Sequence, residues 1–401
     1  MYSDKQLALL QKWRRGELKR INILEGSVRS GKTWISLVLW GLWVATMPAD
    51  GAYLMVAKTL TSLRRNCLDL LQSLFGRSKF DYNLSRKEGR LFGRRIYLEG
   101  VNDARAESKI RGMTLAGAYC DELTLFTEDF FAMLLSRLSE PGAKLIGTTN
   151  PDSPNHWLMT NYIERAGELD MLTMQFLIDD NPFLPAGYVE QLKREYTGVF
   201  YERFIRGAWV VAEGLVYPMF DPSRHVIRDT GGDGMYYISV DYGTLNPCAM
   251  LLWRVEDGRA VCMREYYHDG RKSMVQKTDE EYYDELCNLA GDRMIQAVVA
   301  DPSAASFIET IRRHGRYAVR KGNNSVVDGI RVTASMLESG RLLFDESCTA
   351  TRKEFRAYAW DEKATEDKVI KESDHAMDSL RYLCYTVLRR LWRWEETEWQ
   401  K

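Results

Sequence analysis

The segment GSVRSGKT satisfies the pattern G-x-x-x-x-G-K-[ST], which wraps backbone N–H groups around phosphate. Its eight residues are Gly26, Ser27, Val28, Arg29, Ser30, Gly31, Lys32 and Thr33. In such a loop Lys32 would contact the β and γ phosphates, and the Thr33 hydroxyl would hold Mg²⁺. The guanidinium of Arg29 would reach nucleotide phosphates or pair with a surface carboxylate. The pattern therefore predicts a nucleotide site, against the alternative of a chance glycine turn.

Two further segments supply groups that phosphate hydrolysis needs. The apolar stretch MTLAGAYC precedes Asp121 and Glu122, of which the first would hold Mg²⁺ and the second would orient the attacking water. The apolar stretch AKLIG precedes Thr148, Thr149 and Asn150, polar groups that can sense the γ-phosphate from a strand's carboxyl end. Plainer interpretations exist, because Asp-Glu pairs occur on many surfaces and Asn-Pro often makes a turn.

A second set of acidic residues lies in the carboxyl-terminal half. Asp241 lies inside the apolar stretch ISVDYG, and Asp301 ends the stretch AVVAD. In SDHAMDSLRYL, His375 and Asp378 are three residues apart and would share one face of a helix. Oxygen ligands of this kind suit Mg²⁺ or Mn²⁺, and two such ions about 4 Å apart can cleave a phosphodiester. Each acid alone could be a cap or turn residue, but their order predicts a metal-dependent nuclease.

The elements that must position these groups can be read from hydrophobic patterns. INILE predicts a strand before the glycine loop, and the uncharged run from Trp34 to Met47 predicts a buried helix. That run is shorter than the roughly 20 apolar residues that cross a bilayer, so we expect no membrane partner. The second half predicts three strands, with a hairpin turn at Asp257 and Gly258, then alternating helices and strands of a mixed α/β sheet. Ser373 or Asp374 would cap the last long helix.

Composition narrows the class of protein further. A chain of 401 residues suggests two or three domains, and its formal net charge of -1 argues against a uniformly basic surface. Residues 77–95 nevertheless carry seven Lys or Arg against two acids, which predicts either a polyanion site or a solvated charged hairpin. Seven cysteines without a C-x-x-C pair suit reduced thiols better than a disulfide framework or a sulfur-held metal.

Taken in order, these motifs resemble the large terminase subunit of tailed bacteriophages and prophages, most closely the PBSX-like group. The likeness rests on the arginine-bearing glycine loop, the strand ending CDE, TTNP, VDYG, ADPS and DHAMDSLRY, and it runs over nearly the whole chain. The resemblance implies an ASCE-type P-loop ATPase domain at residues 1–207, a linker at 208–234 and an RNase H-like endonuclease domain at 235–401. It also implies ATP with Mg²⁺ as cofactors of the first domain, and Mg²⁺ or Mn²⁺, two ions in number, as cofactors of the second.

The resemblance assigns roles to single residues as well. The glycine loop corresponds to Walker A, Asp121 and Glu122 to Walker B with its catalytic glutamate, and residues 148–150 to the coupling motif. Asp241, Asp301 and Asp378, with His375 beside them, correspond to the nuclease acids. An adenine-contacting glutamine is implied before the loop, and Gln6 is preferred to Gln11. Arg111, or Arg105 as the alternative, corresponds to an arginine that acts on a neighbouring subunit's nucleotide.

The implied partners are double-stranded DNA, a small terminase subunit, the portal protein of a procapsid and further copies of the chain in a ring, expected to be of five. The implied location is the host cytoplasm, with transient docking on the portal and no place in the mature virion. Two other classes stay open from sequence: a helicase-nuclease or recombinase acting on DNA, and a scaffold that binds nucleotide without turnover. The full motif series of the large helicase superfamilies is not evident, and a scaffold would require neither Glu122 nor the second acidic cluster.

Overall fold

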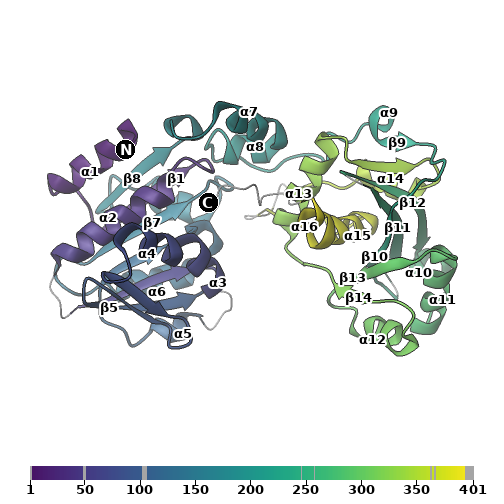
Figure 1. Cartoon of the computed structure of the whole chain (residues 1–401), viewed down its shortest axis with the longest axis horizontal. Coiled ribbons are helices and arrows are strands. Elements are labelled where there is room, and N and C mark those ends of the chain that lie inside the picture. The colour runs from purple at the N-terminus through teal and green to yellow at the C-terminus, as the bar shows by residue number, and fades with distance from the viewer. Residues whose placement is uncertain are drawn as a thin grey trace. The chain divides into compact units, whose positions relative to one another are not determined.

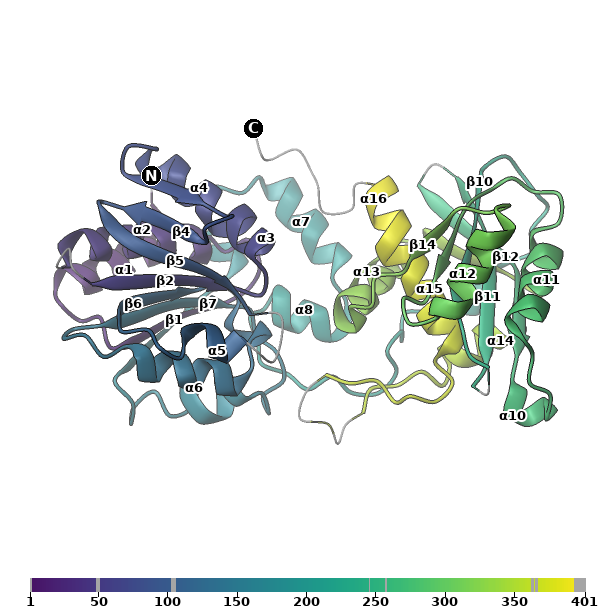
Figure 2. The same cartoon turned by 90° about the horizontal axis from the view of Figure 1, so that it is seen from below.

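The computed structural model describes residues 2–47, 51–101, 106–244, 246–256, 258–361, 364 and 367–392. Internal contacts divide the chain into two compact units, drawn in Figures 1 and 2. The first unit comprises residues 1–193 with 199–211, and the second comprises residues 194–198 with 212–401. Of residues 208–234, expected to form a linker, those from 212 onward belong to the second unit and include helix α9 (Pro222–His225) and strand β9 (Val226–Ile227).

An eight-stranded sheet runs through the first unit in the order β3-β4-β5-β2-β6-β7-β1-β8. Its strands are β1 (Ile21–Gly26), β2 (Ala52–Ala57), β3 (Phe80–Asn83), β4 (Glu88–Leu91), β5 (Arg94–Gly100), β6 (Leu115–Cys120), β7 (Lys144–Thr149) and β8 (Met171–Phe176). Along the sheet, the neighbouring strands β5, β2, β6, β7, β1 and β8 pair in parallel. At the edge opposite β8, β3, β4 and β5 form an antiparallel ribbon. Because β6, β7 and β1 are neighbours, the segments that leave their carboxyl ends meet at one edge of the sheet.

Helices cover both faces of this sheet. They are α1 (Asp4–Arg14), α2 (Lys32–Thr46), α3 (Leu60–Leu63), the π-helix η1 (Arg64–Leu68), α4 (Asp69–Phe75), α5 (Ala106–Ile110), η2 (Leu123–Leu125), α6 (Glu128–Arg137), η3 (Met159–Ile163), η4 (Ile178–Asp180), α7 (Ala186–Glu195) and α8 (Gly198–Phe204). One hydrophobic core lies on the side of α2 and another on the side of α6.

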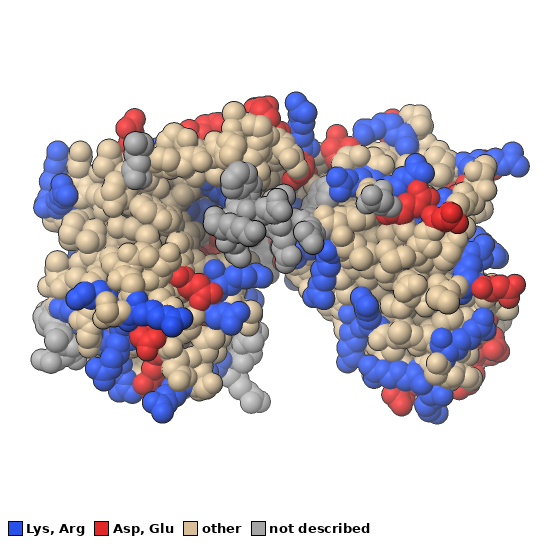
Figure 3. All heavy atoms as spheres, in the orientation of Figure 1, with Lys and Arg blue, Asp and Glu red and all other residues tan. Residues whose placement is uncertain are grey.

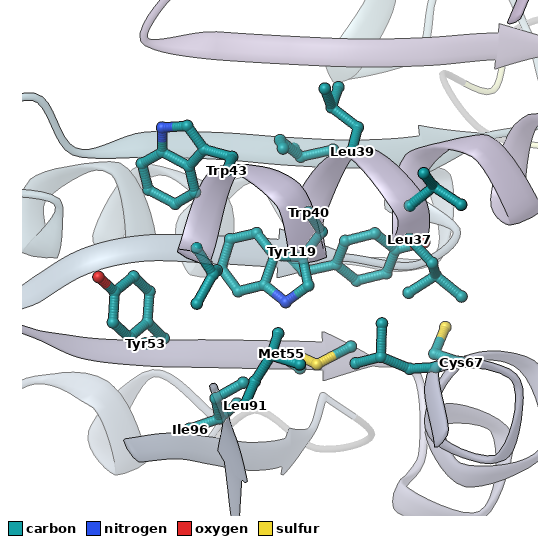
Figure 4. Packing of buried hydrophobic residues seen from close by; sticks show 14 of the residues in the cluster. Leu37, Leu39, Trp40, Trp43, Tyr53, Met55, Cys67, Leu91, Ile96 and Tyr119 are labelled. Carbon is teal, nitrogen blue, oxygen red and sulfur yellow. The ribbon is translucent and has the colours of Figure 1, made fainter. Parts of the chain in front are cut away.

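The buried helix expected in the uncharged run after the glycine loop is confirmed as α2. Its Trp40 and Trp43 pack against Tyr53 of β2, with ring centroids 6.0 and 6.2 Å apart, and Trp40 also contacts Tyr119 of β6 (Figure 4). A helix that is apolar all round is expected to be buried on most sides, which explains why this run carries no charge. Within the described ranges, no helix is long and apolar enough to cross a membrane.

The second unit is built on a seven-stranded sheet in the order β14-β13-β10-β11-β12-β15-β9. Besides β9, its strands are β10 (Met235–Asp241), β11 (Cys248–Glu256), β12 (Arg259–His268), β13 (Ile295–Ala300), β14 (Val319–Lys321) and β15 (Leu342–Asp345). Strands β10, β11 and β12 are antiparallel, and the other pairings are parallel. The expected mixed sheet and its hairpin are therefore confirmed, although Asp257 of the turn lies outside the described residues.

Helices again lie on the two faces of the sheet. Besides α9 they are α10 (Gly270–Ser273), α11 (Asp279–Ala290), α12 (Ala305–His314), α13 (Val326–Glu338), α14 (Thr349–Phe355), α15 (His375–Leu383), η5 (Cys384–Leu388) and α16 (Arg389–Leu391). Along β10, Ile238 and Val240 join the core under α11 and α12. The alternate residues Ser239 and Asp241 point to the other face, where Ser239 Oγ lies 2.9 Å from Ser379 Oγ of α15.

Candidate functional site

The glycine loop leaves β1 and enters α2 through backbone conformations that suit glycine. Gly26 has φ 128°, and a Cβ there would lie 2.0 Å from the carbonyl oxygen of Phe176, so a larger residue cannot fit. Gly31 has φ 82° at the N-cap position of α2, a left-handed conformation that glycine adopts without steric cost. The Ser27 N–H donates to the Phe176 carbonyl at 2.9 Å, which ties the loop to β8. The sequence thus places the N-terminus of a buried helix directly behind the loop.

The loop contains two buried serine hydroxyls. The hydroxyls of Ser27 and Ser30 are buried and make no hydrogen bond within the described residues. Buried hydroxyls are normally paired, so a bound group that supplies acceptors would complete them. Arg29 is exposed with φ 55°, and its carbonyl accepts a hydrogen bond from Asn181 Nδ2 at 2.8 Å. The loop therefore fits an anionic ligand such as a nucleotide phosphate.

Lys32 turns back under the loop and joins it to the neighbouring strand. Its ammonium donates to the carbonyls of Gly26 and Ser27 at 3.4 and 2.9 Å and to Asn150 Oδ1 at 2.6 Å. Burial lowers the pKa of Lys32, while the nearby carboxylates of Glu122 and Asp121 oppose that shift. The lysine is thus held in place by backbone and side-chain oxygens, close to the two acids that follow β6.

Glu122 completes this chain of contacts from β6. Asn150 Nδ2 donates to both carboxylate oxygens of Glu122, at 3.1 and 3.0 Å, so one amide bridges the lysine and the acid. The backbone of Glu122 is left-handed, with φ 56° and ψ 64°, a conformation that costs a residue with a Cβ roughly 1 kcal/mol. Such outliers cluster at functional sites, where surrounding structure holds them. Lys32, Asn150 and Glu122 thus connect the start of α2 to the segments that follow β7 and β6.

Asp121 is held from two sides. Thr148 Oγ1 of β7 donates to its Oδ1 at 3.0 Å, and Asn66 Nδ2 of η1 donates to its Oδ2 at 3.1 Å. Burial raises the pKa of Asp121, and hydrogen bonds from Asn66, Thr148 and Cys67 oppose the rise. Thr149 Oγ1, one residue further on, is turned toward Thr124 Oγ1, 3.0 Å away. Sequence reasoning missed Asn66, because nothing in RRNCL distinguishes it from a polar residue on a solvated helix.

The remaining predicted residues of the first unit differ in burial and in their contacts. Gln6 of α1 is buried, and its Nε2 lies 3.5 Å from the Gly31 carbonyl, whereas Gln11 is exposed. Thr33 is half-buried in the first turn of α2. Arg111 is exposed after α5, and its backbone carbonyl accepts from Arg137 at 2.7 Å. Arg105 lies outside the described residues.

In the second unit, the predicted acids end adjacent strands and begin a helix. Asp241 ends β10, Asp301 directly follows the neighbouring β13, and α15 begins at His375. His375 Nδ1 lies 2.8 Å from Asp241 Oδ2. Burial raises the pKa of Asp241 to about 6, helped by the charges of Asp378 and Asp301 and opposed by His375. The carboxylates of Asp301 and Asp378 are therefore close enough to Asp241 to raise its pKa. Two neighbouring strand ends and a helix that crosses them account for this arrangement.

Each of these carboxylates already has protein donors. Asp378 accepts from Arg381 Nη2 at 3.0 Å and from Lys371 Nζ at 3.1 Å. Asp301 accepts from the N–H and hydroxyl of Ser303 at 2.9 and 2.7 Å. In the described parts of the chain, no three His, Cys, Asp or Glu side chains are grouped closely enough to hold a metal ion. The carboxylate oxygens suit a hard divalent cation. In this structure, however, the ammonium of Lys371 occupies one oxygen of Asp378.

The basic stretch 77–95 forms the edge ribbon of β3, β4 and β5, and part of its charge is neutralised. Arg95 pairs with Glu88, Lys87 Nζ lies 3.1 Å from Glu99, and Arg94 donates to backbone carbonyls. Figure 3 shows Lys and Arg beside Asp and Glu on the visible face of the protein. Binding of a polyanion by this ribbon stays a prediction.

Comparison with known proteins adds to this geometry. Residues 23–224 match the family described as "Terminase large subunit, T4likevirus-type, N-terminal", and residues 263–385 match "Terminase RNaseH-like domain". The large terminase subunit of Escherichia phage T5 is 22% identical over 279 residues, a match that spans 65% of this chain and 62% of that protein.

Solved structures extend the likeness to the whole chain. The large terminase of a thermophilic bacteriophage is 37% identical with a TM-score of 0.92, covering 97% of this chain and 99% of that one. A second structure of that protein, in complex with ATP-gamma-S, is also 37% identical with a TM-score of 0.90, covering 97% and 100% of the two chains. The expected fold, an ATPase domain followed by an RNase H-like domain, is confirmed.

Proposed function

The chain belongs to the large terminase subunits, enzymes that join an ATPase to an RNase H-like nuclease domain, and on that premise we propose how its residues act in DNA packaging. The first unit hydrolyses ATP to move double-stranded DNA into a procapsid. The second unit cuts concatemeric DNA to start and end each round. The observation that carries this proposal is the continuous chain from Lys32 through Asn150 to Glu122, lying beneath a loop whose buried hydroxyls lack partners within the described residues.

In the proposed ATPase, each loop residue has a task. The N–H groups between Gly26 and Thr33 cradle the phosphates, and Lys32 exchanges its present oxygen partners for the β and γ phosphates. Thr33 and Asp121 hold Mg²⁺, and Glu122 orients the attacking water. The ATP analogue bound to the relative from the thermophilic phage supports nucleotide use by this loop.

Other residues contact the nucleotide or sense its state. Gln6 contacts the adenine, and its position 3.5 Å from the Gly31 carbonyl, beside the loop, supports this role. Thr149 and Asn150 report the state of the γ-phosphate to the rest of the unit, and Asn150 already touches both charged partners. Arg29 contacts phosphate from the loop, and Arg111 acts on the nucleotide of a neighbouring subunit, for which its exposure leaves it accessible.

In the proposed nuclease, Asp241, Asp301 and Asp378, with His375, hold divalent cations, Mg²⁺ or Mn²⁺ and two in number. Such ions activate water and stabilise the leaving oxygen of a phosphodiester. The residues of this chain orient that site: His375 fixes one carboxylate oxygen of Asp241, and Ser303 fixes the carboxylate of Asp301. Lys371 has to release Asp378 before that acid can serve as a ligand.

The partners and the domain boundaries are proposals as well. We propose that the chain works with a small terminase subunit and a portal protein, as a ring of five copies, in the host cytoplasm and docked on a procapsid only during packaging. We propose working modules at residues 1–207 and 235–401 with 208–234 between them, a connecting segment whose strand β9 is part of the second unit's sheet. The carboxylates of Glu88 and Glu99 neutralise part of the charge on the edge ribbon, which leaves less positive charge there for contacts with DNA.

One combined assay tests the proposal. The purified full chain is assayed for ATP hydrolysis with and without duplex DNA, for nicking of supercoiled plasmid with Mn²⁺ and with Mg²⁺, and for unwinding of a forked duplex. We expect DNA-stimulated hydrolysis, metal-dependent nicking with little sequence preference that weakens as salt rises, and no unwinding. Hydrolysis and nicking both absent would indicate a scaffold, and unwinding of the fork would indicate a helicase-nuclease.

A further inference from the structure

The first turn of α15 is capped by a residue outside its own segment. A helix start leaves N–H groups without intrahelical partners. Asp374, one of the two expected N-cap residues, occupies that position, but its side chain makes no capping hydrogen bond. Instead, the N–H groups of Ala376 and Met377 donate to Glu354 Oε2 at 2.6 and 3.2 Å. A carboxylate at this place also suits the positive end of the helix dipole.

Glu354 is itself fixed from the central sheet. It lies on α14, is 4% exposed, and its Oε1 accepts from the hydroxyl of Tyr267 on β12 at 2.7 Å. The start of α14 is held in the same manner, because the N–H groups of Ala350 and Thr351 donate to Glu265 of β12 at 2.6 and 2.9 Å. Strand β12 therefore fixes α14, and α14 in turn fixes α15.

These contacts form a closed path that includes Asp241 of β10. Asp241 is directly opposite Ala249, and Ala249 is directly opposite Tyr267, so the three side chains lie in one row on the face of the sheet that α15 covers. His375 of α15 lies against Asp241, 2.8 Å away. The path runs from Tyr267 through Glu354 to the first turn of α15, then through His375 back to the sheet. A shift of the helix start would therefore move His375 away from its partner.

We propose that Glu354 is a positioning residue of the nuclease site, which holds the first turn of α15 so that His375 and Asp378 face Asp241. The proposal rests on the proposed nuclease function and deepens it. Glu354 contacts no reacting atom, because both of its oxygens are directed at Tyr267 and at backbone N–H groups. The buried acid therefore acts through the helix.

Three variants of the full chain test the proposal. Glu354→Leu removes the acceptors at similar size, and Glu354→Gln keeps one oxygen that can accept from the two N–H groups. Glu372→Gln is the control, because it removes an exposed carboxylate nearby without touching the helix start. Hydrogen exchange of the segment 372–380, Mn²⁺ affinity by electron paramagnetic resonance, plasmid nicking and ATP hydrolysis are measured for each.

We expect Glu354→Leu to expose the amides of the first turn of α15 to exchange, and to weaken Mn²⁺ binding and nicking by roughly tenfold or more, since small displacements of reacting groups have large effects. Glu354→Gln should recover most of each readout, Glu372→Gln should match wild type, and ATP hydrolysis should be unchanged in all three. Glu354→Leu with wild-type exchange, or with wild-type Mn²⁺ affinity and nicking, would overturn the proposal. So would an equal loss in Glu354→Leu and Glu354→Gln.

Two further outcomes remain decisive. If Glu354→Leu does not fold, Tyr267→Phe replaces it, because that change loosens Glu354 while keeping the carboxylate. Faster exchange of the first turn of α15 with weaker Mn²⁺ binding then supports the proposal, and wild-type values overturn it. If the wild-type chain binds Mn²⁺ but cuts no DNA, the proposed nuclease function fails, and the exchange and affinity data still decide the role of Glu354.

Discussion

Asn150→Ala is the change that most directly tests the proposed ATPase centre. The asparagine amide accepts from Lys32 through Oδ1 at 2.6 Å and donates to both oxygens of Glu122 through Nδ2. Its orientation is fixed by this network, since the reversed amide would point two donors at each other. Removing the side chain deletes the hydrogen bonds by which Asn150 bridges Lys32 and Glu122, while the loop's own N–H groups are untouched.

The magnitude follows from the kind of contact that is lost. A hydrogen bond to a charged group contributes about 1.5 to 3 kcal/mol. If about 2 to 3 kcal/mol of this contact serves to orient Glu122 during hydrolysis, kcat falls roughly 30- to 150-fold, at 1.36 kcal/mol for each factor of ten. The affinity for ATP-gamma-S should change little, because phosphate is held mainly by the loop and by Lys32.

Steady-state ATP hydrolysis and calorimetric binding of ATP-gamma-S give the two readouts. Asn155→Ala is the matched control: Asn155 is exposed in the loop after β7, and its contact with Ser153 uses its backbone N–H. The reasoning is refuted if a folded Asn150→Ala protein keeps kcat within about threefold of the control. It is also refuted if the whole loss appears in nucleotide affinity.

Four other substitutions probe the remaining roles. Glu122→Gln should bind ATP-gamma-S like wild type with turnover close to background, whereas Lys32→Ala should lose binding itself; comparable turnover in Glu122→Gln and wild type would remove the catalytic role. Mixing Arg111→Ala with Glu122→Gln subunits should restore part of the hydrolysis, since a trans-acting arginine contributes roughly 10³- to 10⁵-fold, and mixed rings without rescue would count against it. Asp301→Ala should nick plasmid at less than about a tenth of the wild-type rate while ATP hydrolysis stays unchanged, and wild-type nicking would contradict the nuclease assignment.

The sequence predicted those parts of the fold in which local pattern and tertiary role agree. The glycine loop between an apolar strand and an uncharged helix allowed one arrangement, and β1 and α2 confirm it. The antiparallel start of the second sheet was similarly visible in apolar-rich stretches on both sides of a turn signal. Periodicity and turn residues act over short distances, which is why they can be read without a structure.

Contacts between distant segments were not visible in the same way. Asn66 reaches Asp121 from a π-helix, and Lys371 reaches Asp378 from an irregular segment, and neither belongs to a pattern that sequence reasoning can detect. Glu354 and Tyr267 are 87 residues apart and meet because β12 pairs with β15, the strand that precedes α14. Supporting contacts of this kind depend on the assembled fold, so sequence alone indicated the acids but not what holds them.

The left-handed backbone of Glu122 makes the stability of the fold and the rate of ATP hydrolysis favour different residues at this position. Glycine there would relieve roughly 1 kcal/mol of backbone strain, yet it would remove the carboxylate proposed to orient water. Selection for heat resistance alone would therefore favour a more stable chain without ATP turnover, whereas selection for ATP turnover would retain the strained acid. A library randomised at this codon and sorted separately for folding and for ATP turnover would select two different residues, and the difference in stability between them would measure how much stability the fold gives up for ATP turnover.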